Sequence, residues 1–148
     1  MSLAVQIAVR NAQRKVRIDV RELQNFATRA LSLCLTRNPP FKTNLRKLAA
    51  VSVVLVSDRR MAALHRQFMN IAGPTDVITF QHGEIFASVE TARRNATEFG
   101  TSLAKEIKLY IVHGLLHLDG FDDATIAASR AMETAQKRIF FAAFGTSK

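Results

Sequence analysis

Residues 113 to 123 of this 148-residue chain read HGLLHLDGFDD, the most specific indication of fold and chemistry that it contains. Two histidines four residues apart on a helix project from one face, so the imidazoles of His113 and His117 can reach a single metal ion. Gly120 can end that helix in a left-handed conformation and bring Asp122 or Asp123 back towards the same ion. Two imidazoles and one carboxylate, with a fourth position open for water, are typical of a catalytic zinc site.

The alternative interpretation is a histidine pair that is buried, hydrogen-bonded and inert. The residues around the pair are almost all apolar, which predicts a buried helix, and buried imidazoles need partners that a shared ion would supply. Peptidases of the HExxH type carry Glu directly after the first histidine, and Gly114 at that position argues against a peptidase. No general base is evident, although Asp122 can act as one or can support a ligand.

Three further blocks occur in an order that matches a known family. PTDVITF lies at 74–80, GEI at 83–85, and a helix start of SxExARR character at 88–94. With HGLLHLDGFDD, the matching region runs from about Val51 to Ala142 and resembles the YbeY-type endoribonucleases, the bacterial rRNA maturation factors. The resemblance implies an α+β fold with a zincin-like metal helix, and zinc-dependent cleavage of single-stranded RNA in rRNA maturation and ribosome quality control. It also implies rRNA and the small ribosomal subunit as partners, and a metal site of His113, His117 and Asp123.

The chain departs from the family pattern at two positions. The family's third ligand is a histidine, and the matching Asp123 is a competent zinc ligand whose harder oxygen shifts preference towards manganese or magnesium. The family also carries an arginine shortly before the PTD block, and the matching residue is Met69, so Arg66 or another neighbour has to supply that charge. These changes motivate two alternatives: a catalytically impaired RNA- or ribosome-binding protein of the same fold, and a metal-dependent hydrolase with a non-RNA substrate.

Positive charge gathers in the first half of the chain. The net charge is +9, and residues 1–70 carry 13 Lys or Arg against 3 acidic residues, whereas residues 71–148 carry 8 against 9. A basic surface attracts polyanions, most often nucleic acid, although an ordinary solvated face has the same composition. With one Tyr and no Trp, we expect contacts with RNA phosphates rather than base stacking, and Arg59, Arg60 and Arg66 are the candidates.

Hydrophobic periodicity predicts a single compact domain over residues 1–148, with a small mixed sheet of about four strands packed with about five helices. The expected strands are 5–9, 51–56, 75–80 and 84–87, and the expected helices are 19–36, 58–69, 88–99, 102–119 and 124–144. Asp19 and Glu22 suit a capping box, Asp58 suits a cap, and Asn38-Pro39-Pro40 suits a helix end. Cys34 is the only cysteine, which favours a reducing cytoplasm. Neither a signal peptide nor a membrane span is evident.

Several other polar residues are candidates for a role in the histidine site. Glu106 and Tyr110 fall on the same helical stripe and can orient the imidazoles. For Glu106 we favour instead an exposed first-turn acid stabilised by the helix dipole. His65 and His82 are not expected to be ligands, and Asp76 is expected to bond turn backbone.

Overall fold

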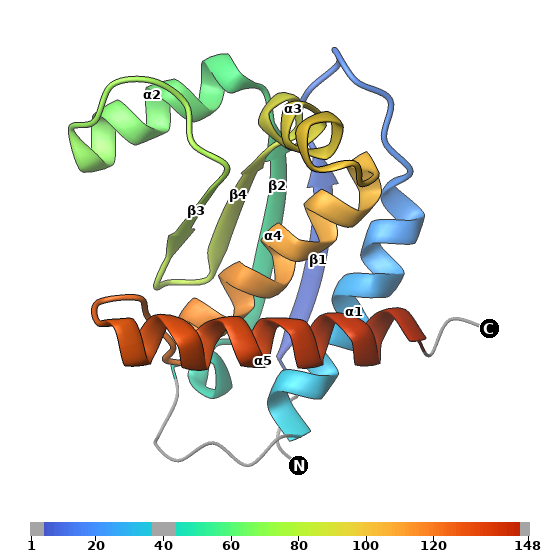
Figure 1. Ribbon diagram of the computed structural model, residues 1–148, viewed down its shortest axis with the longest axis vertical. Helices are drawn as coiled ribbons and strands as arrows, with labels where there is room; N and C mark the ends of the chain where they lie inside the picture. The colour runs from blue at the N-terminus through green and yellow to red at the C-terminus, as the bar shows by residue number, and fades with distance from the viewer. Residues whose placement is uncertain (1–4, 37–43, 146–148) are drawn as a thin grey trace.

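The computed structural model describes residues 5–36 and 44–145, which form one α+β domain (Figure 1). The elements are β1 (Gln6–Asn11), α1 (Val20–Thr36), a 3-10 turn (Leu45–Lys47), β2 (Ala50–Val56), α2 (Asp58–Met69), β3 (Val77–Phe80), β4 (Glu84–Ser88), α3 (Val89–Phe99), α4 (Leu103–Leu118) and α5 (Ile126–Gly145). The expected four strands and five helices are confirmed, with bounds that agree within two residues. The expected stop at Asn38-Pro39-Pro40 lies outside the described residues. No helix among those described is both long and apolar enough to cross a membrane.

The four strands form one mixed sheet in the order β1-β2-β4-β3. β2 pairs in parallel with β1 and β4, and β3 pairs antiparallel with β4, so β3 is an edge strand whose other side has no strand partner among the described residues. Side chains alternate across a strand. Val53 and Leu55 therefore join the larger core beneath α1, α4 and α5, whereas Val54 and Val56 join a smaller cluster beneath α2. Helices thus cover both faces.

Helix α4 crosses the main face of the sheet and is enclosed by other elements. Figure 1 shows α5 lying across α4 and α1, and α4 also contacts α3, β3 and β4. Burial therefore extends around most of the helix and includes two charged residues, Glu106 and Lys108. Gly114 permits a very close approach to β4, because a Cβ atom there would lie only 2.7 Å from the Ile85 side chain.

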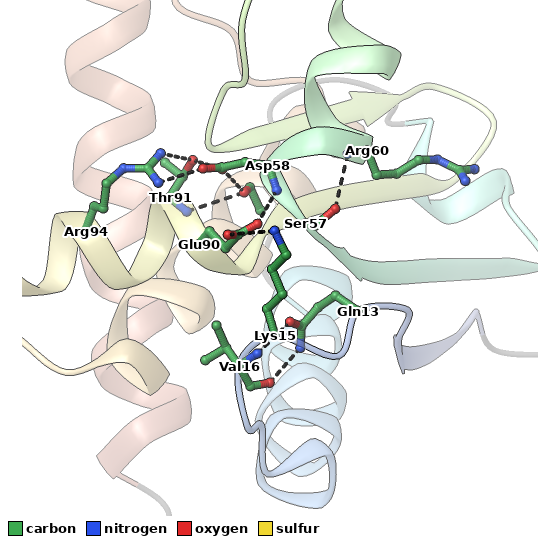
Figure 2. Close-up of polar contacts among 10 residues, drawn as sticks. Gln13, Lys15, Val16, Ser57, Asp58, Arg60, Glu90, Thr91 and Arg94 are labelled. Atoms are coloured by element: carbon green, nitrogen blue, oxygen red, sulfur yellow. Dashed lines mark hydrogen bonds and ion pairs between the residues drawn. The ribbon is translucent and has the colours of Figure 1, made fainter.

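Helices α2 and α3 begin side by side and are joined by hydrogen bonds between their first turns (Figure 2). Ser57, rather than the expected Asp58, is the N-cap of α2, and its hydroxyl accepts a hydrogen bond from the Arg60 amide. Asp58 is the first helical residue, where its backbone amide donates to Glu90 Oε1 at 2.9 Å. A carboxylate of α3 therefore satisfies an amide at the start of α2, where the helix dipole also favours negative charge.

The Asp58 carboxylate makes the converse contacts with α3. It accepts hydrogen bonds from Ser88 Oγ at 2.6 Å, from Thr91 Oγ1 at 2.7 Å and from Arg94 Nη1 at 2.6 Å. Burial opposes ionisation of Asp58, but these bonds outweigh it and lower the pKa of the carboxyl group. The SxExARR block thus joins the start of α3, which follows β4, to the start of α2, which follows the adjacent strand β2.

The expected capping box of α1 is only half formed. Asp19 Oδ1 accepts a hydrogen bond from the Glu22 amide at 3.1 Å, as expected. The Glu22 carboxylate instead binds Lys108 Nζ at 3.0 Å, and that ammonium also lies over the rings of Phe26 and Phe144. Lys108 reaches its partner from a buried position on α4, so the pair ties α4 to α1.

Candidate metal and RNA site

His113 and His117 lie one turn apart on α4, and their imidazoles converge. The two Nε2 atoms are 3.1 Å apart, and the rings meet edge to face. His117 Nδ1 lies 3.1 Å from the Phe121 carbonyl oxygen, and His113 Nδ1 lies 2.9 Å from Gln136 Oε1. The Phe121 carbonyl only accepts, so a neutral His117 carries its proton on Nδ1; with Gln136 Oε1 turned towards His113, a neutral His113 does the same, and each Nε2 then presents a lone pair. Two lone pairs at this distance need a shared cation or proton.

Electrostatics keep His117 in its neutral form. Burial is the largest cause that lowers its pKa, and the neighbouring His113 lowers it further. The Phe121 carbonyl, Asp123 and Asp122 oppose this shift without reversing it. Neutral imidazole is the form that binds a metal, so the pair fits a divalent cation held through the two Nε2 atoms.

The turn after α4 forms as expected, but the carboxylates do not close around the histidines. Gly120 has φ +101°, in the left-handed region. Asp122 Oδ1 accepts a hydrogen bond from the Ala124 amide, and Asp123 is exposed. Within residues 5–36 and 44–145, no three His, Cys, Asp or Glu side chains are grouped closely enough to hold a metal ion. The structure therefore brings the two predicted histidines together without Asp123.

A small hollow of about 210 Å³ separates the histidine pair from the edge strand β3. Val77, Thr79 and Gln81 line it together with Met69, from the end of α2. Met69 stands where the family resemblance places an arginine, and its thioether supplies no positive charge to this hollow. We call this space the histidine hollow.

The polar residues near His113 on the side away from the histidine hollow are arranged differently from the prediction. Glu106 is buried and accepts a hydrogen bond from Thr101 Oγ1, so the expectation of an exposed first-turn acid is wrong. α4 is enclosed at this point, and a surface-helix argument does not apply. Tyr110 binds Asn95 rather than an imidazole, and burial raises its pKa to about 12. The residue that orients His113 is Gln136 of α5, which the sequence pattern did not single out.

The remaining predicted site residues lie on the other side of β3 or outside the hollow. Arg59, Arg60 and Arg66 are exposed on α2, as a role in RNA binding requires. His82 is exposed and binds Glu84, and His65 binds the Gly73 carbonyl through Nδ1. Asp76 accepts a hydrogen bond from the Val77 amide, as expected for a residue that supports a turn.

Gly114 explains why the chain lacks the peptidase glutamate. A Cβ atom at this position would meet three Ile85 side-chain carbons at 2.7–2.9 Å. Glutamate at this position collides with β4 at its first side-chain atom, so α4 cannot carry the HExxH base without moving away from the sheet. The close packing argues against the peptidase interpretation independently of the motif.

Comparison with known proteins agrees with this fold. The family model described as Endoribonuclease YbeY matches residues 8–143. An endoribonuclease YbeY from Carboxydothermus hydrogenoformans is 31% identical over 143 residues, covering 90% of this chain and 94% of the relative. One from Moorella thermoacetica is 37% identical over 110 residues, covering 62% of this chain and 70% of the relative. The solution structure of the TM1509 protein from Thermotoga maritima matches with a TM-score of 0.66 at 27% identity, covering 94% and 89% of the two chains. The chain therefore belongs to the YbeY endoribonuclease family.

Proposed function

We propose that this protein is a metal-dependent endoribonuclease that cleaves single-stranded RNA during rRNA maturation and ribosome quality control in the cytoplasm. The observation that carries the proposal is the convergence of two Nε2 lone pairs at 3.1 Å while both Nδ1 atoms face oxygen acceptors. This arrangement recurs in metal-binding histidines, whose other ring nitrogen is held by a carbonyl or carboxylate. The basic first half of the chain and the family membership support RNA as the substrate.

His113 and His117 would hold the ion, with Asp123 as the third ligand from the exposed segment after Gly120. Nitrogen and carboxylate donors suit zinc, and the carboxylate also admits another divalent metal. A bound divalent ion supplies Lewis acidity, which activates water and neutralises charge on a phosphate. Gln136 and the Phe121 carbonyl hold the imidazoles in the required tautomer.

The protein's own groups would position the RNA and move protons. Arg59, Arg60 and Arg66 provide exposed positive charge along α2 for the RNA backbone. Asp122 is the candidate general base, because it lies beside Asp123 and acts electrostatically on His117. The partners proposed on the same grounds are rRNA and the small ribosomal subunit.

A catalytically impaired RNA-binding protein of the same fold is the second candidate. Two observations favour it: Met69 lines the histidine hollow at the position of the family arginine, and Asp123 is not grouped with the histidine pair. In that case RNA affinity would not depend on His113 or on bound metal.

Metal content and RNA cleavage separate these candidates. Protein purified without chelator should contain about one divalent ion per chain by elemental analysis. His117→Ala and Asp123→Ala should lose at least ten-fold in metal affinity and in cleavage of an unstructured RNA, whereas the matched controls His65→Ala and Asp122→Ala should keep the metal. If His117→Ala lost the metal but kept both RNA binding and RNA cleavage, the proposal would be contradicted. Full retention of metal in Asp123→Ala would remove that residue from the ligand set.

Metal uptake should also depend on pH in a defined direction. Burial and His113 lower the pKa of His117 below its ordinary value of 6.5, so the neutral ligand persists below that pH. Zinc affinity should therefore fall in acidic solution, as the pH drops through the lowered pKa of His117 and protons compete with the metal for the imidazole. A competition titration with a chromophoric chelator at each pH measures this, and a zinc affinity that does not fall in acidic solution would contradict the assignment.

A further inference from the structure

A second hollow lies on the opposite face of β3 from the histidines. It has a volume of about 330 Å³, between α2 and the hairpin of β3 and β4. Phe68, Phe80, Phe86 and His82 contribute four rings to its walls, and Arg60 and Glu84 contribute charge. We call it the aromatic hollow. Its volume falls at the small end of the range for ligand pockets, which run from about 300 to 1,000 Å³.

The rings form an ordered surface around Phe80. Phe68 meets Phe80 at 5.0 Å between centroids and 73°, and Phe86 meets it at 5.8 Å and 86°. His82 stacks with Phe80 at an interplanar angle of 23°. The Phe68 side chain is nonetheless 56% exposed, so apolar aromatic surface remains open to solvent at the mouth of the hollow. Planar, apolar and polarisable surface of this kind suits stacking of a nucleobase.

Charge around the hollow suits the polar parts of a nucleotide. Arg60 is exposed, and Figure 2 shows its side chain extending away from the capping network. A guanidinium in this position can bind a phosphate, because its planar fork of donors matches the phosphate oxygens. The exposed pair of His82 and Glu84 offers a donor and an acceptor to the edge of a base.

The aromatic hollow and the histidine hollow are neighbours across the edge of the sheet. Phe68 lines one and Met69 the other, and Phe80 lines one while Thr79 lines the other. Consecutive residues of a strand are separated by about 3.3 Å and point to opposite faces. A chain that crosses the free edge of β3 can therefore place a phosphate beside the histidines and an adjacent base against the rings. A flexible single strand can make this turn, whereas paired bases are unavailable for stacking.

We infer that the aromatic hollow is the binding site for an unpaired base of the RNA, within one or two nucleotides of the phosphate at the histidine pair. The inference rests on the proposed endoribonuclease function and adds a physical reason for selecting single strands. Phe68 provides the exposed stacking surface, Phe80 the wall behind it, and Arg60 the contact with the neighbouring phosphate.

The test uses a labelled, unstructured RNA in which one abasic nucleotide is moved along the strand. Fluorescence anisotropy gives the dissociation constant in the cold, and a gel confirms that the RNA stays intact. In the wild-type protein, one abasic position next to the cleavage site should weaken binding about 5- to 150-fold, the range for loss of one stacked base. Phe68→Ala should weaken binding of the complete RNA by a similar factor and should abolish the penalty at that position.

Two control variants make the result specific. Phe68→Tyr keeps the ring and should retain wild-type affinity, and Phe141→Ala removes a ring of similar exposure (64% against 56%) from α5 and should change nothing. Unchanged affinity in Phe68→Ala, or an abasic penalty that persists in it, would overturn the inference. If the wild-type protein cleaves RNA while Phe68 proves irrelevant, only this inference fails. If the wild-type protein neither binds nor cleaves RNA, the proposed function fails together with it.

Discussion

Replacing Gly114 with alanine should destabilise the protein, although alanine is the better helix former. Gly114 lies in the middle of α4, and an added Cβ atom would meet Ile85 Cδ1, Cγ2 and Cγ1 at 2.7, 2.7 and 2.9 Å. The Ile85 side chain is fully buried in the main core, and its branched Cβ restricts it to few rotamers. A small movement of the Ile85 side chain therefore cannot relieve the overlap with the added Cβ atom.

The expected size follows from two opposing terms. Overpacking of a filled core costs about 1–3 kcal/mol, and three simultaneous overlaps place this case near about 2.5 kcal/mol. The change from glycine to alanine in a helix interior returns roughly 0.8–1.0 kcal/mol. The free energy of unfolding should therefore fall by about 1.5 kcal/mol. At roughly 2–4 °C per kcal/mol for a domain of this size, Tm should fall by about 3–6 °C.

Thermal unfolding monitored by circular dichroism measures this change in Tm directly. In a protein that already carries Ile85→Ala, the effect of Gly114→Ala on Tm should have the opposite sign. Ile85→Ala alone should cost about 2–5 kcal/mol through the cavity that it leaves. Adding Gly114→Ala to that variant should then raise Tm, because the methyl group enters vacated space and the helix gains propensity. A rise in Tm for Gly114→Ala in the wild-type background would refute the close-packing explanation.

Three further predictions concern ionisable side chains: Asp58, Tyr110 and the ion pair of Glu22 with Lys108. Asp58→Asn should lose about 1 kcal/mol at neutral pH, because it removes the charged bond from Arg94, which solvent screens since the Arg94 side chain is 59% exposed. The hydrogen bonds to the Asp58 carboxylate lower its pKa below 3.8. The difference in free energy of unfolding between wild type and Asp58→Asn, measured by chemical denaturation, should therefore shrink as pH falls through the lowered pKa. A difference that stays constant with pH would contradict this explanation. Tyr110 is the only tyrosine, so ultraviolet titration of the folded protein should show one transition at about pH 12. The free energy of unfolding should fall as pH rises from 10 towards 12, because the unfolded chain loses the Tyr110 proton first. A midpoint at pH 10 in the folded protein would refute burial as the cause of the raised pKa. Glu22→Gln should cost about 1–3 kcal/mol by leaving the Lys108 ammonium buried, whereas Lys108→Met should be nearly neutral; equal losses in denaturant would argue against this explanation.

Local signals in the sequence were sufficient for the elements and for the histidine pair. Pro74 and Gly83 bound the hairpin region, and the four-residue spacing of His113 and His117 places both rings on one face of α4. Gly120 ends the helix in the left-handed conformation expected of glycine at that point. These features depend on neighbours within a few residues, and for that reason periodicity and turn chemistry describe them well.

Contacts between distant segments were not predictable in the same way. Gln136 reaches His113 because α5 packs on α4, and Lys108 is buried because α1 and α5 cover α4, with Glu22 of α1 as its ion-pair partner. Glu106 was assigned to the surface for the same reason, since nothing near it in the chain shows that α4 is enclosed. The low aromatic content argued against base stacking, yet three elements bring Phe68, Phe80 and Phe86 together.

The parallel pairing of β1, β2 and β4 has a kinetic consequence for folding. The pairs Gln6–Ala50 and Ser52–Glu84 join segments far apart in the chain, whereas Phe80 and Glu84 close a local hairpin. Long loops lose more entropy on closure, so the hairpin should form early and the parallel pairs late. The histidine hollow forms only when α4 packs on the complete sheet. A folding intermediate in which β2 has not yet paired with β4 would therefore contain α4 and the β3–β4 hairpin but no assembled histidine hollow.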